Sequence, residues 1–339
     1  MSKARTPLPW PDRRWRAALG MACALLAGAD MAHAQAAPSA ARVYVSNEKD
    51  NQIVVFDAQG QNLARIPVCQ RPRDMKFSPD GTRILVICAD SNQLGWVDLA
   101  QQKMVGTLPL GDSPEMFGLS PDGKTAYVSS EDDSALQAFD LVTRKKLFEV
   151  KTGGEPEGVL VMPDGQFAYV TSEVANVVHR IDLQQKKVLQ NIKVGSRPRR
   201  FSLSPDGKEV WVSNELGASV SVIDAATQQV KATVPFQIAG MRASDITPVG
   251  LVHSPDGRSV WVSLGRANHV AEVDAVSKQL RRTVLVGKRA WGLALNKAGS
   301  MLYVTNGLSD DMTLVDTAQG KALRSVAAGR VPHTVLVRE

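Results

Sequence analysis

The chain has 339 residues, of which 44% are hydrophobic and 22% are charged, as expected for a globular protein with a buried core. Its 40 Lys and Arg exceed its 34 Asp and Glu, which gives a net charge of +6. Only one long apolar run exists, and it stands at the N-terminus, which argues against a membrane-embedded protein.

Residues 1–34 have the pattern of a secretion signal. Basic residues from Lys3 to Arg16 precede an apolar stretch at 17–29, and residues 32–34 read Ala-His-Ala, an A-x-A cleavage site. We therefore expect cleavage after Ala34 and a periplasmic mature chain, residues 35–339, without a membrane span. The signal holds five basic and two acidic groups, so the mature chain keeps a net charge of +3. This small excess argues against binding to nucleic acid.

A Pro-Asp-Gly turn signal recurs along the mature chain. Its copies stand at 78–81, 120–123, 162–165, 204–207 and 254–257, with a degenerate copy at 296–299. Pro presets φ and Gly accepts positive φ, so each copy predicts a tight turn. The copies follow one another at 42 residues, with one interval of 50, which indicates a repeat architecture.

Short apolar strands are expected between these turns. The strand after each turn is headed by a bulky residue: Tyr44, Leu85, Tyr127, Tyr169, Trp211, Trp261 and Tyr303. The next strand ends in aspartate: Asp57, Asp98, Asp140, Asp182, Asp224, Asp274 and Asp316. A third strand runs into a turn, and a further strand opens with Pro72, Pro114, Pro156, Pro198, Pro248, Ala290 or Pro332. We expect the aspartates to bond the following turns and the aromatic residues to pack between units.

Four-stranded units at this period fit an all-β fold, the β-propeller. The first unit lacks its Pro-led strand, and the chain ends with that strand alone, at 331–337. We therefore predict a seven-bladed β-propeller over residues 35–339. Its C-terminal strand should pair with the N-terminal blade and close the ring.

The repeats resemble the YVTN family. Matching tetrapeptides stand at 44–47 (YVSN), 169–172 (YVTS) and 303–306 (YVTN). Further segments are similar to the PQQ-dependent catabolism-associated β-propeller proteins: 155–158, 171–173, 197–199, 264–268, 289–291 and 305–311. The resemblance implies an exported, seven-bladed protein associated with quinoprotein alcohol oxidation. It implies no settled biochemical activity.

The candidate site lies at one end of the ring, which we call the top. There the loops before the Pro-led strands meet the loops after the strands headed by Tyr or Trp, around the mouth of the central channel. The predicted ligand- or partner-binding residues are Arg71, Arg73, Glu115, Glu155, Glu157, Arg197, Arg199, Arg289, Trp291, Arg330 and His333, with the repeated carboxylates Glu48, Glu131, Glu173 and Glu215. Arginines suit planar carboxylates through forked hydrogen bonds. The alternative is a solvated rim on which Arg197 and Glu155 pair across neighbouring blades.

Two further features belong to the top. The one insertion in the repeat pattern falls in a top connection, at 236–247, where it would form a lid or an ordered rim. Cys69 stands where other repeats have Gly, near Cys88 in the repeat alignment, so an oxidising compartment makes a disulfide an option beside two free thiols. No haem-attachment, zinc-like, nucleophile-elbow or phosphate-loop motif occurs, so no metal and no catalytic residue are predicted.

Three functions remain open from the sequence. The favoured one is a non-catalytic accessory propeller of PQQ-dependent alcohol oxidation. Its top would bind a small anionic ligand, PQQ among the candidates, or dock the quinoprotein dehydrogenase or its cytochrome c. The second is a hydrolase of the lactonase type, with Glu115, Glu155 and Glu157 as candidates for general acid and base. The third is a propeller that binds nucleic acid or a surface.

Overall fold

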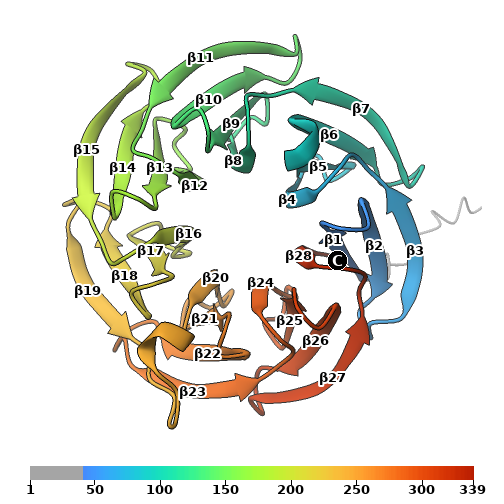
Figure 1. Cartoon of the computed structure of the whole chain (residues 1–339), viewed down its shortest axis with the longest axis vertical. Helices are drawn as coiled ribbons and strands as arrows, with labels where there is room; N and C mark the ends of the chain where they lie inside the picture. The colour runs from blue at the N-terminus through green and yellow to red at the C-terminus, as the bar shows by residue number, and fades with distance from the viewer. Residues whose placement is uncertain (1–40) are drawn as a thin grey trace, which may run out of the picture. The chain divides into compact units, whose positions relative to one another are not determined.

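The computed structural model describes residues 41–339, so the predicted signal peptide lies outside the described residues. This part of the chain forms seven four-stranded antiparallel sheets, arranged as blades around a central axis (Figure 1). The prediction of an all-β, seven-bladed propeller is therefore confirmed.

Each blade runs from an inner strand beside the axis to an outer strand at the circumference. The inner strands are β4 (Pro72–Phe77), β8 (Pro114–Leu119), β12 (Pro156–Val161), β16 (Pro198–Leu203), β20 (Pro248–His253), β24 (Ala290–Leu295) and β28 (Pro332–Arg338). The second strands are β1 (Arg42–Asn47), β5 (Arg83–Cys88), β9 (Thr125–Ser130), β13 (Phe167–Ser172), β17 (Glu209–Asn214), β21 (Ser259–Leu264) and β25 (Met301–Asn306).

The remaining two strands of each blade lie farther from the axis. The third strands are β2 (Gln52–Asp57), β6 (Gln93–Asp98), β10 (Ala135–Asp140), β14 (Val177–Asp182), β18 (Ser219–Asp224), β22 (His269–Asp274) and β26 (Asp311–Asp316). The outer strands are β3 (Asn62–Pro67), β7 (Lys103–Pro109), β11 (Lys145–Lys151), β15 (Lys187–Lys193), β19 (Val230–Pro235), β23 (Leu280–Leu285) and β27 (Lys321–Ala327).

The ring closes through its last strand. β28 pairs antiparallel with β1, with Val335 opposite Val45, and the sheet order is β28-β1-β2-β3. The predicted closure by the C-terminal strand is therefore confirmed. Because the two ends of the described chain share one blade, the ring has no free joint between its first and last units.

The repeated aspartates hold the turns that follow the third strands. Asp57 Oδ1 accepts hydrogen bonds from the backbone N–H groups of Gln59 and Gln61, at 2.9 and 2.8 Å. The other six aspartates also accept from backbone N–H groups two or three residues further on. This confirms their predicted scaffold role.

The repeated aromatic residues are core residues. Trp211, Trp261, Tyr169 and Tyr303 are among the largest fully buried side chains. Tyr303 of β25 belongs to the same apolar cluster as Val43 of β1, in the neighbouring blade. Burial between blades, rather than within one sheet, is therefore what joins the units.

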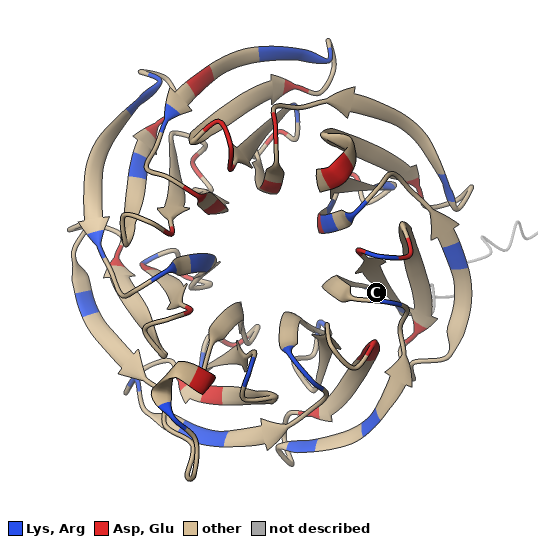
Figure 2. Ribbon diagram, in the orientation of Figure 1, with Lys and Arg blue, Asp and Glu red and all other residues tan. Residues whose placement is uncertain are grey.

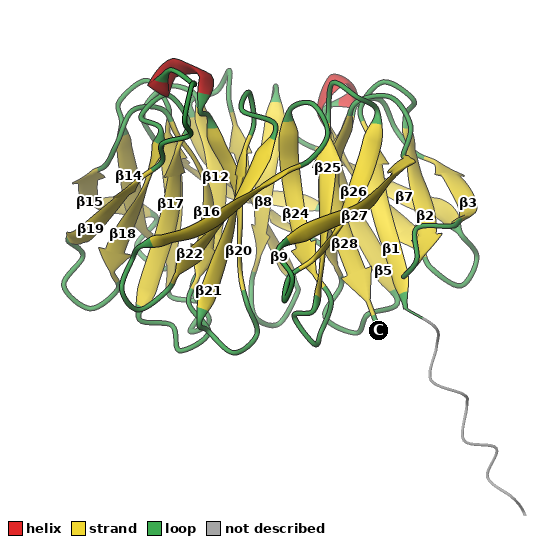
Figure 3. Ribbon diagram, turned by 90° about the horizontal axis from the view of Figure 1, so that it is seen from below, coloured by secondary structure: helices red, strands yellow, loops and turns green. Residues whose placement is uncertain are grey.

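Both short 3₁₀ helices, η1 (Ala89–Ser91) and η2 (Ala243–Asp245), lie at the same end of the ring, which is the top (Figure 3). η2 belongs to the 236–247 insertion. This segment is anchored at both ends, because Phe236 and Ile246 are buried in one apolar cluster. Neither helix comes near the length and hydropathy that a membrane-spanning helix needs, and residues 41–339 contain no other helix.

Candidate active site at the channel mouth

Every inner strand carries a β-bulge at its top end. In β12 the pairing with β13 shifts between Pro156 and Val159, and the other six inner strands have a corresponding shift. A bulge changes the direction of the local side chains. The residues that follow the strand-opening position form what we call the channel ring: Arg73, Glu115, Glu157, Arg199, Val249, Trp291 and His333.

A hydroxyl group from the second strand holds the bulge. Thr171 Oγ1 accepts a hydrogen bond from the N–H of Gly158 at 2.7 Å and donates to the carbonyl of Arg199, in the next blade, at 3.1 Å. Ser or Thr makes the corresponding bond to the bulge N–H in five other blades, and β5 has Ile87 in this place. The Ser or Thr of the YVTN-like tetrapeptide therefore fixes the backbone of the channel ring.

The top of the channel contains a cavity of about 320 Å³. Figure 2 shows residues of both charges at the inner ends of the blades. The lining residues are Glu48, Arg71, Arg73, Glu115, Glu131, Glu157, Arg197, Arg199, Arg289, Trp291, Gly307, Leu308, Val331, Pro332 and His333. The structure thus brings most of the predicted site residues together around one space of small-molecule size.

A contact across the channel forms the floor of this cavity. Arg200 Nη2 lies 2.9 Å from His333 Nε2, and Arg73 Nε lies 3.4 Å from the same nitrogen. Burial and the nearby arginines lower the pKa of His333 well below its ordinary value, so the ring is neutral and accepts at Nε2. Arg200 lines a separate cavity of about 230 Å³ below the floor. The contact between Arg200 and His333 therefore lies between the two cavities.

Two buried carboxyl groups on neighbouring blades face the same arginine. Glu115 and Glu157 are 2% and 3% exposed, and the guanidinium of Arg73 lies within 4 Å of both carboxyl groups. Burial, and then the charge of Glu157, raise the pKa of Glu115 to about 9. Burial also acts to raise the pKa of Glu157, but Arg199 at 3.0 Å and Arg73 outweigh it and hold that pKa at about 2. Glu115 is therefore neutral at pH 7 and donates a hydrogen bond to ionised Glu157.

The carboxylates after the second strands have different environments. Glu48 lines the cavity and binds Arg71 at 3.3 Å. Glu173 and Glu215 do not line it, because they lie behind the arginines: Glu173 is 2.5 Å from Arg197 Nε, and Glu215 is 2.9 Å from Arg199 Nη1. Burial raises the pKa of Glu173 to about 7 against the opposing charge of Arg199.

Glu131 is different from these three carboxylates. It lines the cavity, is half-buried, and accepts a hydrogen bond from the Ser113 hydroxyl at 3.5 Å. Within residues 41–339 it has no ion-pair partner. Among the carboxylates that line the cavity, Glu131 is therefore the one that forms no ion pair with an arginine.

Two further predicted site residues, in addition to Glu173 and Glu215, lie outside the cavity lining. Glu155 is exposed, and Arg330 is exposed and pairs with Asp50 at 2.6 Å. The alternative pair of Arg197 with Glu155 does not form, because Arg197 binds Glu173 instead.

Sequence reasoning also missed Arg200. The sequence contained one signal for it. Arg200 directly follows Arg199 and is the second residue of the bulge, a position from which the side chain also points to the channel.

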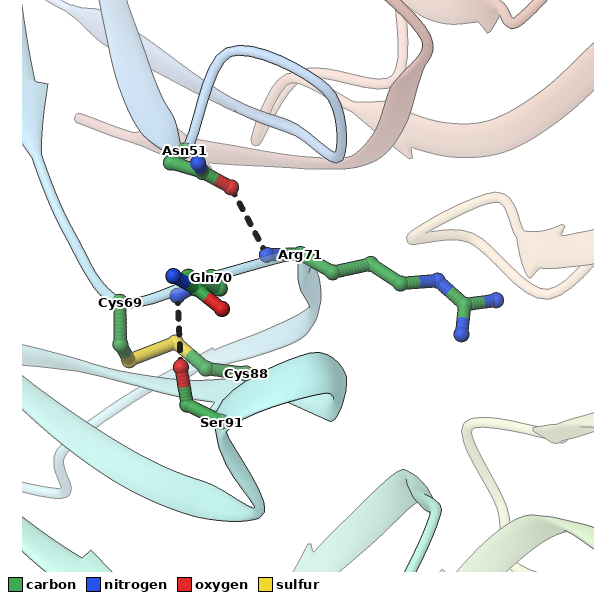
Figure 4. Close-up of a disulfide and its surroundings, with 6 residues drawn as sticks. All are labelled: Asn51, Cys69, Gln70, Arg71, Cys88 and Ser91. Atoms are coloured by element: carbon green, nitrogen blue, oxygen red, sulfur yellow. Dashed lines mark hydrogen bonds between the residues drawn. A yellow bond between two sulfur atoms is a disulfide. The ribbon is translucent and has the colours of Figure 1, made fainter.

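A disulfide joins Cys69 to Cys88 beside the cavity, with their Cα atoms 5.6 Å apart (Figure 4). Five of the other six blades have Gly at the place of Cys69, where a side chain would be crowded: a Cβ on Gly195 would lie 2.5 Å from Asn214 Cγ, at the end of the second strand. In the β4–β7 blade this close approach becomes a covalent bond. The bonded loop leads directly into Arg71, whose N–H donates to Asn51 Oδ1 at 2.9 Å.

No group of three or more His, Cys, Asp or Glu side chains between residues 41 and 339 has an arrangement that could hold a metal ion. The site instead offers a neutral carboxyl group, an unpaired carboxylate and several arginines around one cavity. These groups can bind an anion or a carbonyl group and can move protons.

Two family models match the chain. The YNCE-like beta-propeller model matches residues 117–298, more than half of the chain, and the model of the lactonase, 7-bladed beta-propeller matches residues 24–108. No curated protein matches it. The family matches support the β-propeller part of the expected resemblance and carry no association with PQQ.

Solved structures share the fold. A periplasmic gluconolactonase of Pseudomonas aeruginosa gives a TM-score of 0.76 at 21% identity, over 89% of this chain and 99% of that one. A putative 6-phosphogluconolactonase of Bacteroides uniformis gives 0.75 at 15% identity, over 89% and 100%. Hydrazine synthase of Kuenenia stuttgartiensis gives 0.73 at 23% identity, over 81% and 92%. Likeness at these identities establishes the fold.

The expectation of a non-catalytic accessory propeller in PQQ-dependent oxidation is contradicted. The lactonase model and the lactonases among the structural neighbours favour the hydrolase alternative. The physical reason lies in the charges that suggested a docking face. Most of them are buried or half-buried in the channel mouth and paired with one another, so they do not face a partner. By its match over residues 117–298, the chain belongs to the YNCE-like β-propeller family.

Proposed function

We propose that this protein hydrolyses a lactone, with the cavity at the channel mouth as its active site. The observation that carries the proposal is the state of the pocket's carboxyl groups. Neutral Glu115 and unpaired Glu131 line the same cavity, which gives one proton donor and one proton acceptor around a single bound molecule. The match of residues 24–108 to seven-bladed lactonases supports this reading. The disulfide suits an oxidising compartment, and we propose the periplasm.

The proposed chemistry needs no covalent intermediate. A water molecule attacks the lactone carbonyl carbon while the Glu131 carboxylate takes one of its protons. The negative charge that develops on the carbonyl oxygen is stabilised by the positive charge of the arginines that line the pocket. The acyl C–O bond of the ring then breaks, and Glu115 donates its proton to the departing ring oxygen. The product is an open-chain hydroxy acid, and the two carboxyl groups return to their starting states through solvent.

Turnover of simple lactones tests this proposal. Purified mature chain, residues 35–339, should open glucono-δ-lactone and related aldonolactones faster than buffer does. Glu115→Gln and Glu131→Gln should each lower kcat by about a hundredfold or more, since general acid–base groups contribute about 10²–10⁴-fold.

Glu155→Gln is the matched control. Glu155 is an exposed glutamate of the same rim that does not line the cavity, so its variant should keep wild-type kcat. Equal turnover by wild type, Glu115→Gln and Glu131→Gln would rule out these roles. No turnover of any lactone by wild type would overturn the proposed function.

A further inference from the structure

One arginine of the pocket differs from the others in having no carboxylate partner. Within residues 41–339, the other lining arginines, Arg71, Arg73, Arg197 and Arg199, each form at least one ion pair with a glutamate. Arg289 forms none, and its guanidinium lies 4.7 Å from the ring centroid of Trp291. Among the arginines that line the pocket, Arg289 is therefore the one whose guanidinium is free to bind an anionic ligand.

The backbone of Arg289 is fixed although its side chain is exposed. The residue has a left-handed φ of 59°, its N–H donates to Asn268 Oδ1 at 2.9 Å, and its carbonyl accepts from the N–H of Gly307 at 3.0 Å. The guanidinium also stacks on a buried indole. Because little conformational freedom remains to be lost, this arginine is preorganised for binding.

A second observation points to the same spot. Trp291 is 7% exposed, and its indole Nε1–H has no hydrogen-bond partner within residues 41–339. A buried donor without an acceptor is costly, and an anionic oxygen beside Arg289 would satisfy it.

The places of these residues in the ring indicate how a bound molecule would be oriented. Arg73, Glu115, Glu157 and Arg199 come from four successive inner strands, β4 to β16, whereas Trp291 comes from β24 on the other side of the ring (Figure 1). Arg199 and Arg200 also lie 5.3 and 5.6 Å from the Trp291 ring centroid, so an anion at Arg289 would have cations around it and would leave the rest of the molecule to reach the buried glutamates.

We propose that Arg289 and Trp291 form a subsite for an acidic substituent of the substrate, a carboxylate or a phosphate, so that the pocket takes an anionic lactone. This inference rests on the proposed function. The acidic group binds at Arg289 and holds the lactone ring toward Glu115 and Glu131. Arg289 then acts as a specificity-determining residue and takes no part in proton transfer.

Binding of stable open-chain acids tests the subsite without any turnover. Calorimetric titration of 6-phosphogluconate and of glucarate into the mature chain should show saturable binding, stronger for whichever acidic group the subsite prefers. Arg289→Gln should weaken it by at least about tenfold, as expected for the loss of one charge-assisted pair. Lys288→Gln, which removes the neighbouring exposed cation, is the matched control and should bind as wild type does. Equal affinity in wild type and Arg289→Gln would overturn the subsite.

A kinetic comparison separates failure of the subsite from failure of the function. If the subsite is right, Arg289→Gln raises KM for an acidic lactone by about tenfold or more and leaves kcat nearly unchanged, while KM for neutral glucono-δ-lactone stays as in wild type. An equal loss with both lactones would overturn the subsite while hydrolysis stands. Arg289-dependent binding of the acids without turnover of any lactone would overturn the proposed function and leave the anion subsite in place.

Discussion

Arg200 of β16 reaches across the channel to His333 of β28, with 2.9 Å between Nη2 and Nε2. Both side chains are buried, and both belong to bulges at the top of inner strands. The neutral imidazole accepts at Nε2, while its Nδ1 lies 3.0 Å from the Thr334 hydroxyl. This contact lies between the cavity at the channel mouth, which His333 lines, and the second cavity, which Arg200 lines.

Removing Arg200 should destabilise the fold. Arg200→Ala takes one cation away from buried Asp74 and Glu157, and breaking a buried charge network typically costs about 3–5 kcal/mol. Arg200→Met fills the same space without a charge, so we expect it to cost less than Arg200→Ala. The free energy of unfolding in urea measures both. A loss below about 1 kcal/mol for Arg200→Ala would show that the floor contributes little to stability.

His333 should remain neutral through the range in which histidines ordinarily titrate. Its pKa is lowered by burial first and by Arg200 and Arg73 next, and its nitrogens are already engaged. NMR chemical shifts of the His333 ring should therefore not change between about pH 5 and 8, the range in which an exposed histidine changes charge. In Arg200→Met the pKa should move upward. A wild-type midpoint near the ordinary value of 6.5 would contradict the described floor.

Glu115 should make stability depend on pH in a recognisable direction. Its pKa is about 9 in the folded state against an ordinary 4.5, so the folded chain binds more protons than the unfolded chain between these values. Its contribution to stability is complete below about pH 4.5 and is lost as pH rises toward 9.

Glu115→Gln removes this titration. The free energy of unfolding of wild type should therefore decrease relative to that of Glu115→Gln as pH rises. A pH-independent difference would show that Glu115 is ionised throughout.

The disulfide should stabilise the ring through the loop that it closes. The two cysteines are 19 residues apart, for which chain entropy gives about 3 kcal/mol. Cys69→Ala/Cys88→Ala should lose about that much free energy of unfolding. Cys69→Gly/Cys88→Asn copies the pair at Gly195 and Asn214, and it should retain more stability, because Gly avoids the Cβ contact that its position forbids. Equal losses in the two double variants would contradict this account of the Gly-to-Cys exchange.

The hydroxyl that holds each bulge should matter for both stability and site geometry. Thr171→Val keeps the shape of the side chain but leaves the Gly158 N–H and the Arg199 carbonyl without a partner. We expect this to lower the free energy of unfolding by about 1–3 kcal/mol. Because Arg199 is a lining residue, binding of an anion to the pocket should weaken as well. Thr171→Ser, which restores the hydroxyl, is the matched control. An unchanged stability in Thr171→Val would show that the bulge holds without this bond.

The periodic features of the sequence predicted the fold well. Pro-Asp-Gly turns at 42-residue spacing and the missing first strand sufficed for seven blades and for the pairing of β28 with β1. These features depend on local turn chemistry and on the alternation of apolar and polar residues along a strand, both of which a sequence shows directly. Placing Arg73, Glu115 and Arg199 at one channel mouth needed only the equivalence of positions between repeats.

The electrostatic state of the site could not be predicted in this way. The charges of Arg197 and Glu155 suggested a pair, whereas the folded chain pairs Arg197 with Glu173. Such choices depend on bulge geometry and on distances across blades, which periodicity does not contain. Arg200 was missed for the same reason: its role comes from crossing the channel to His333, a residue 133 positions away.

The pH dependence of lactone hydrolysis tests the central claim most directly. With spontaneous ring opening subtracted, kcat of the mature chain on an aldonolactone should fall as pH rises through about 9, where Glu115 loses the proton that it donates. In Glu115→Gln this fall should be absent, and kcat should be lower than in wild type by about a hundredfold or more. A wild-type profile without the fall, or a Glu115→Gln variant that keeps both the fall and the rate, would contradict the assignment of Glu115 as the proton donor.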